Sequence, residues 1–147
     1  ISTCVVRATG FFSDMTEVFE MAASGRIYLI GDGSSRVNPV HGADLAAACL
    51  DAMQTDVTEV NVGGPDVLDW EQIATCAFDV LGTPKKVTRV PSWVPRAALP
   101  VVRLFNRRAY DVGSFISRGA VHDVVAPPHG HHTLTAYFQE LARARLA

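Results

Sequence analysis

Histidines are the residues best suited to chemistry in this sequence, and they gather near its C-terminal end. His129, His131 and His132 form its only dense group of side chains that commonly bind metals. An imidazole can bind a divalent metal ion or exchange a proton near neutral pH. Consecutive histidines on a regular element do not direct both rings at one ion, however, and no acidic residue lies nearby in the sequence. The pattern therefore favours a solvated or loop-packing role over a metal site.

A second pair of titratable residues, His41 and Asp44, lies three positions apart where a helix is expected to begin. The spacing would allow an acid/base pair, but polar side chains at this place more often cap helix amides. We therefore expect capping and orienting roles. The sequence also contains no GxSxG or HExxH motif, so nothing positive indicates a hydrolase.

Two glycine-containing turns could bring backbone amides close to a phosphate group. The first, residues 31–36, carries an arginine at the third glycine position of the dinucleotide fingerprint and precedes a strand-like segment rather than a helix. The second, Gly63-Gly64-Pro65, follows a strand, but its proline has no amide hydrogen. We expect the first to be a hairpin or connecting turn and the second to end its strand.

The composition is that of a globular protein. The chain has 147 residues, 48% of them hydrophobic, with a formal net charge of −2. These values predict a single domain over residues 1–147 and argue against nucleic-acid binding, so that small molecules or proteins are the expected partners. Three cysteines without a CxxC pair indicate a reducing, cytoplasmic location. The longest apolar stretch, residues 90–105, is broken by prolines and arginines and is too short to span a membrane.

Strands and helices alternate along the chain, which predicts the α/β class. The first strand has apolar residues on both faces, as in a strand with neighbours on each side. Ser13 is expected to cap the first helix and Asp69 a later one that ends at Gly82. The expected strands cover residues 2–8, 26–30, 36–40, 58–62 and 85–90, and the expected helices cover 14–24, 43–53, 70–81, 94–107, 109–117 and 133–146.

In type and order, these features resemble the C-terminal half of short-chain dehydrogenases/reductases of the extended or atypical kind, the NAD(P)-binding epimerase and NmrA-like relatives. Residues 5–15 look like the late Rossmann strand of that family, and residues 36–46 look like its short strand and Asp-Leu-Ala helix start. Residues 61–65 and 124–138 resemble its later strand end and its C-terminal segment. From the first to the last of the four segments, the resemblance spans nearly all 147 residues.

The resemblance implies a partial Rossmann-like fold that takes part in binding NAD(P) and a small-molecule substrate. The loop after the late Rossmann strand passes beside the nicotinamide in the family. The cofactor-binding residues implied are Arg7, Thr9 and Gly10, and the substrate-binding residues are Phe11 and Phe12. Core packing explains the two phenylalanines equally well. No catalytic residue and no metal ligand are assigned.

The chain departs from the family pattern in two ways. Ala8 stands where the family usually has a proline after Arg7, and the Gly-rich loop and the Tyr-x-x-x-Lys pair of the family's first half are missing. We therefore expect a fragment that is inactive and binds NAD(P) weakly on its own. Its exposed strand edge would be covered by a second copy or by a separate N-terminal half.

Two other interpretations stay open from the sequence. One is a protein without catalysis, either an NmrA-like regulator or an assembly or scaffold subunit. The other is a lipid-facing module that uses the apolar stretch at residues 90–105, although core burial would explain that stretch as well.

Overall fold

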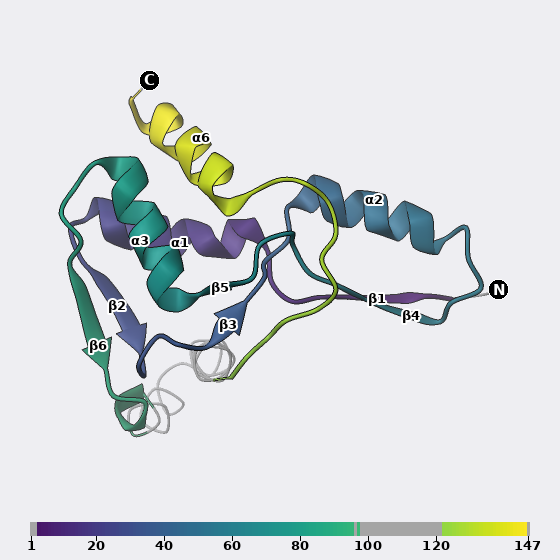
Figure 1. Cartoon of the computed structure of the whole chain (residues 1–147), viewed down its shortest axis with the longest axis horizontal. Coiled ribbons are helices and arrows are strands. Elements are labelled where there is room, and N and C mark those ends of the chain that lie inside the picture. Colours follow the sequence, from purple (N-terminus) through teal and green to yellow (C-terminus); the bar gives the residue numbers. More distant parts are fainter. Residues whose placement is uncertain (1–2, 96, 98–121, 147) are drawn as a thin grey trace, which may run out of the picture.

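A computed structural model of the chain describes residues 3–95, 97 and 122–146 (Figure 1). The expected helix at 109–117, most of the helix at 94–107 and much of the apolar stretch at 90–105 lie outside the described residues. Each helix in the described part of the chain falls short of the length and hydropathy needed to cross a membrane.

The described elements confirm the α/β class. In chain order they are β1 (Val5–Ala8), α1 (Phe12–Ala23), β2 (Ile27–Ile30), β3 (Arg36–Val37), α2 (Gly42–Ala52), β4 (Glu59–Val62), β5 (Leu68–Asp69), α3 (Trp70–Leu81), β6 (Val87–Val90) and α6 (Leu134–Leu146). The strands form three pairs: β1 lies parallel to β4, β2 lies parallel to β6, and β3 lies antiparallel to β5. The sequence patterns did not predict β5, which has only two residues.

Local capping explains where the helices begin and end. The Asp69 carboxylate accepts a hydrogen bond from Gln72 N at 2.6 Å, and Gly82 ends α3 with a φ of 64°, so both expected ends of this helix are confirmed. The expected cap at Ser13 is wrong. The first helix begins at Phe12, because the Asp14 carboxylate accepts a hydrogen bond from Phe11 N and closes the first turn two residues earlier than expected.

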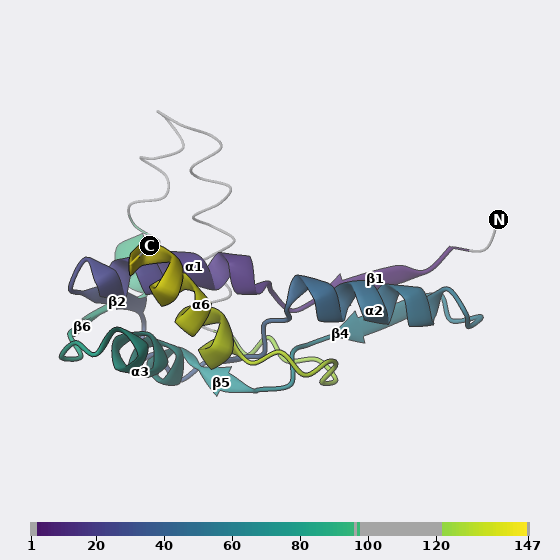
Figure 2. The same cartoon turned by 90° about the horizontal axis from the view of Figure 1, so that it is seen from above.

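Two lobes lie end to end in the molecule (Figures 1 and 2). The helical lobe consists of α1, β2, α3, β6 and α6, and the strand lobe consists of β1, α2 and β4. The helical lobe holds the larger core, whose fully buried side chains include Phe19, Ile27, Ile73, Phe78, Leu134 and Phe138. Aromatic rings from α1 and α6 meet in it, with 5.4 Å between the ring centroids of Phe19 and Phe138.

The strand lobe has a much smaller core on one face of its strand pair. Helix α2 covers that face, where Val40, Ala48 and Val62 are buried. On the other face Val5 is 52% exposed and Arg7 forms an exposed ion pair with Glu59. Within the described residues β4 is the only strand paired with β1, so the neighbour expected on the second edge of the first strand does not come from this part of the chain.

Candidate functional site

Residues 124–132 of the C-terminal segment run past the junction of the two lobes and are fastened there by the buried Asn38. The Asn38 side-chain amide donates to Gly64 O at 3.1 Å and to Ala126 O at 2.8 Å, and its Oδ1 accepts from Ala126 N at 3.1 Å. Three hydrogen bonds satisfy nearly the whole capacity of this buried group. Asn38 therefore joins three chain segments that are distant in sequence.

The glycines after β4 serve this junction. Gly63 N donates to Pro127 O, and Gly64 N donates to Asn38 O. A Cβ at either glycine would overlap the chain at Asn38 or Pro39. These amides are therefore occupied by protein carbonyls, and the turn is a close-packed end of its strand rather than a phosphate cradle.

Asp44 is the second buried polar group at the junction, and it lies in the first turn of α2 with 4% exposure. Its Oδ2 accepts from the backbone N–H groups of His131 and His132, at 3.1 and 3.0 Å. Its Oδ1 lies 2.7 Å from His132 Nδ1. Burial alone would raise the pKa of Asp44, but the hydrogen bonds from His132 and the two amides outweigh burial and hold this pKa below its ordinary value. The carboxylate is therefore ionised at neutral pH.

Gly130 makes the approach of the C-terminal segment to Asp44 feasible. Its φ is 77°, and a Cβ here would overlap the Asp44 carboxylate. Only glycine combines this left-handed backbone with so close an approach. The chain can therefore wrap its next two amides around the buried oxygen.

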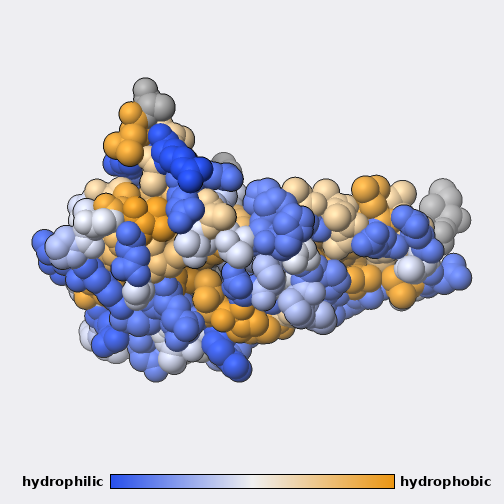
Figure 3. Space-filling model, turned by 45° about the horizontal axis from the view of Figure 1, so that its top comes forward, coloured by the Kyte–Doolittle hydropathy of each residue, from blue (hydrophilic) through white to orange (hydrophobic). Residues whose placement is uncertain are grey.

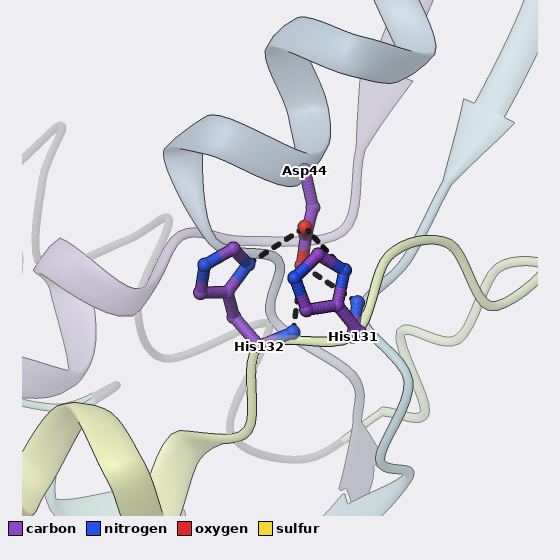
Figure 4. Close-up of side chains that lie close together, drawn as sticks. All are labelled: Asp44, His131 and His132. Atoms are coloured by element: carbon purple, nitrogen blue, oxygen red, sulfur yellow. Dashed lines mark hydrogen bonds and ion pairs between the residues drawn. The ribbon is translucent and has the colours of Figure 1, made fainter.

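Three histidine rings lie close together at this point. The ring of His132 stacks on that of His41 at a centroid distance of 4.2 Å, and it lies 4.4 Å from the ring of His131, tilted by 31° (Figure 4 shows His131, His132 and Asp44). Nδ1 of His41 accepts from Ala43 N, which confirms its expected capping role. His132 packs within the loop, as the sequence predicted. The sequence around the histidines contains no acidic partner, but in the fold His132 contacts Asp44, which lies 88 positions away in the chain.

The residues expected to bind the cofactor follow β1. Arg7 Nε lies 2.9 Å from Glu59 Oε1 on the uncovered face, and Thr9 Oγ1 donates to Asn38 O at 2.6 Å. Gly10 O accepts from Val40 N. The loop after the strand is thus held in place by the chain around Asn38, and Arg7 stands apart from it in solvent.

The two phenylalanines expected to contact substrate have different environments. Phe11 is 42% exposed, whereas Phe12 is 3% exposed and packs its ring against those of His41 and Tyr137. Phe11 can therefore face a ligand, and Phe12 belongs to the core that positions it.

The start of α1 does not fit the pyrophosphate of a dinucleotide. Phe11 N donates to Asp14 and Phe12 N donates to Val40 O, so neither amide is available. The turn at residues 31–36 is a connecting turn, as expected, in which Asp32 accepts from Ser34 N. Within the described residues, neither of these two turns offers a glycine-rich loop with free amides for a phosphate.

An open groove of about 330 Å³ lies elsewhere, between α3 and α6. Its lining is Gln72, Thr75, Cys76, Asp79, Val80 and Thr135. None of the residues expected to bind cofactor or substrate lines it. It is therefore separate from the proposed cofactor loop.

Comparison with known proteins confirms the family resemblance at the level of the fold. UDP-N-acetylglucosamine 4-epimerase from Bacillus cereus superposes with a TM-score of 0.53 at 13% identity, over 98% of this chain and 47% of that one. UDP-glucuronic acid 4-epimerase from Bacillus cereus, in complex with NAD, gives 0.52 at 15% identity over 62% and 34%. dTDP-glucose 4,6-dehydratase from Bacillus anthracis, in complex with NAD, gives 0.51 at 19% identity over 60% and 32%.

One curated relative is a subunit of a larger enzyme. NADH dehydrogenase [ubiquinone] 1 alpha subcomplex subunit 9, mitochondrial, from Arabidopsis thaliana is 29% identical over 77 residues, which are 50% of this chain and 19% of that protein. No family model matches the chain. The chain spans between a third and a half of the length of the solved structures named above, and a fifth of the plant protein.

Proposed function

We propose that this chain, which has the fold of the extended short-chain dehydrogenases/reductases, is the substrate-side C-terminal part of an NAD(P)-dependent oxidoreductase or epimerase. The uncovered side of the β1–β4 pair is the observation that carries the proposal. Parallel sheets occur almost only with both faces covered, and two strands alone are marginal in water. The strand lobe therefore fits a larger sheet in which a nucleotide-binding unit continues from the free edge of β1.

The position of the predicted cofactor residues supports this assignment. Ligands of open α/β sheets bind beyond the carboxyl ends of the strands. Thr9, Gly10 and Phe11 follow the carboxyl end of β1, and Phe11 is exposed there. In the completed site Thr9 and Gly10 line the cofactor, and Arg7, which lies on the uncovered face of β1, contacts it once the docked unit covers that face. Phe11 contacts an apolar part of the substrate, and Phe12 fixes the loop from the core.

Bound NAD(P) would supply the hydride chemistry of such a site. The residues of this chain position the loop beside the cofactor and shield the site from water. Asn38 and Val40 hold the loop that carries Phe11, and the phenylalanine ring limits access of water. The glycine-rich loop that binds the pyrophosphate and the side chain that donates the proton belong to the docked unit. On its own, therefore, the chain has no turnover and no tight cofactor binding.

Figure 3 shows apolar surface on the strand lobe, which suits contact with further protein. Its exposed hydrophobic side chains are Val5, Leu50, Met53 and Val57. Light scattering on the isolated chain tests whether this apolar surface must be covered by further protein. We expect the chain to associate with itself as its concentration rises. A monomer at all concentrations with one cooperative melt would contradict the proposal.

A titration with NADH and NADPH, followed by cofactor fluorescence, tests the incomplete site. We expect no saturable change with the chain alone, and saturable binding once the chain is expressed together with the coding sequence that precedes it in its gene. Arg7→Ala should then weaken binding, while Arg26→Ala, which removes an exposed arginine bound to Thr88 in the helical lobe, should not. Tight binding by the isolated chain would overturn the proposal.

The similarity to a subunit of a larger complex favours a second candidate, an assembly subunit that keeps the fold without catalysis. In that case the protein expressed with its preceding sequence would bind NADH or NADPH without oxidising it in the presence of any keto-sugar nucleotide tested. An NmrA-like regulator would behave in the same way but without a stable protein partner.

A further inference from the structure

We propose that Asp44, His131 and His132 form a binding site for a divalent transition-metal ion, with Zn²⁺ as the expected occupant. One ligand atom from each of these three residues lies within 4.8 Å of the other two, and the residues come from the start of α2 and from the segment before α6 (Figure 4). Asp44 Oδ1 faces the Nδ1 atoms of both histidines.

The buried charge of Asp44 is the first observation behind the site. Buried carboxylates are normally paired with a cation or bound to a metal. The ion partners of Asp44 within the described residues are His131 and His132, and neither carries the permanent charge of lysine or arginine. A divalent cation would supply the missing positive charge.

The distances between the ligand atoms suit one ion. His132 Nδ1 lies 2.7 Å and His131 Nδ1 lies 3.8 Å from Asp44 Oδ1. Ligand atoms that share a tetrahedral Zn²⁺ at about 2.1 Å lie roughly 3.4 Å apart. The two distances lie on either side of this spacing and differ from it by about 0.7 and 0.4 Å, so small side-chain movements would bring both histidines to the required distance from the carboxylate oxygen.

The surroundings hold the ligands in place before an ion arrives. Asp44 Oδ2 is fixed by two backbone N–H groups, which leaves Oδ1 directed at the histidines. His41 stacks against His132 at 4.2 Å and steadies the plane of that ring. Such outer contacts orient metal ligands and raise affinity.

The site is open to solvent on one side. The side chain of His131 is 85% exposed and that of His132 is 39% exposed, whereas Asp44 is buried. An ion can therefore enter past His131, and water can fill its fourth position. Three protein ligands with one open position are typical of catalytic zinc.

Binding replaces a proton with the ion. In the neutral tautomer that carries its proton on Nδ1, His132 donates this N–H to Asp44 Oδ1. When the metal occupies Nδ1, that proton leaves to solvent and the imidazole takes up one proton at Nε2, so the ring stays neutral. No oxidant or other reactant is needed.

Calorimetric titration of the tag-free, chelator-treated protein with ZnCl₂ tests the site. We expect one Zn²⁺ per chain and a rise in melting temperature with Zn²⁺ concentration. With CoCl₂ in place of zinc, we expect visible absorption bands of a four-coordinate Co²⁺ ion. Absence of saturable binding to the wild-type protein would overturn the proposal and leave Asp44 and His132 as a structural hydrogen bond.

Two histidine variants from the same loop sharpen the test. His131→Ala removes an exposed ring and keeps the backbone N–H that binds Asp44, so the fold should persist. It should weaken Zn²⁺ binding by more than about tenfold, the lower end for loss of even an outer-shell partner. The control His129→Ala removes a ring that contacts Pro127 O and lies outside the cluster, and it should leave affinity unchanged. Equal loss in both variants, or no loss in His131→Ala, would overturn the proposal.

Discussion

The helical and strand lobes are built from the same chain but differ in how completely they bury their apolar surface. Three helices and a strand pair enclose large aromatic and aliphatic side chains in the helical lobe. The strand lobe encloses Val40, Ala48 and Val62 under one helix and leaves its opposite face in solvent. Since burial of apolar area is the main favourable term in folding, the first lobe can support itself, whereas the second depends on cover from elsewhere.

The largest expected effect is a difference between the two cores in how much the free energy of unfolding falls when a core side chain is truncated. Phe78→Ala in the helical lobe should lower the free energy of unfolding by about 3–5 kcal/mol, because it removes a fully buried ring and leaves a cavity. Val60→Ala, on the partly buried face of β4, should cost roughly 1 kcal/mol. Urea denaturation followed by circular dichroism measures both. Equal losses would remove the distinction between the lobes.

The next effect concerns the contact between the C-terminal segment and α2 at the junction of the two lobes. Gly130→Ala combines a strained positive φ with overlap against Asp44, so it should cost about 3 kcal/mol and free the C-terminal segment from α2. Gly25→Ala is the matched control, because Gly25 has a φ of 96° but open space around it, and should cost about 1 kcal/mol. The same denaturation experiment compares them. A cost at Gly130 no larger than that at Gly25 would show that the close approach to Asp44 does not matter.

A smaller effect, with a defined pH dependence, is expected from the ion pairs. The Lys85 ammonium bonded to Glu71 at 2.7 Å, with Arg89 nearby, holds the pKa of the half-buried Glu71 below its ordinary value. A lowered pKa in the folded state means that this stabilisation is present above the unfolded-state pKa of about 4.3 and is lost as the pH falls through the folded-state value.

Glu71→Gln should therefore destabilise the protein at pH 7, and its difference from the wild type should shrink as the pH falls below about 4. In the strand lobe, Glu59→Gln breaks a more exposed pair with Arg7 and should change stability less at pH 7. Unfolding measured from pH 3 to 7 gives both profiles. A difference for Glu71→Gln that stays constant over this range would contradict the assignment.

Features set by neighbouring residues could be predicted from the sequence. The ends of α3 follow from Asp69 and Gly82, which act within a few positions of the helix. The α/β class also follows from the order of local patterns, and the family resemblance implied the fold that the superposed epimerases confirm. The cap of α1 was misplaced because Asp14, an acceptor inside the helix, closes the turn in place of Ser13.

The junction could not be predicted, because its contacts join residues about 90 positions apart. Neither Asn38 with Ala126 nor Asp44 with His132 is visible in a local window. Two clues were present: Asp44 is one of two charged residues in an alanine-rich helix, and Gly130 interrupts a histidine run. Similarly, the sequence could not separate Phe11 from Phe12, since burial depends on how α6 packs over α1.

The central claim is that the strand lobe is incomplete without further protein, and native-state hydrogen exchange tests it most directly. In the isolated chain, backbone amides of α3 and β2 should exchange only through global unfolding, whereas those of β1 and β4 should exchange through a local opening of much lower free energy. Uniform protection of both lobes in a monomeric sample would contradict the claim.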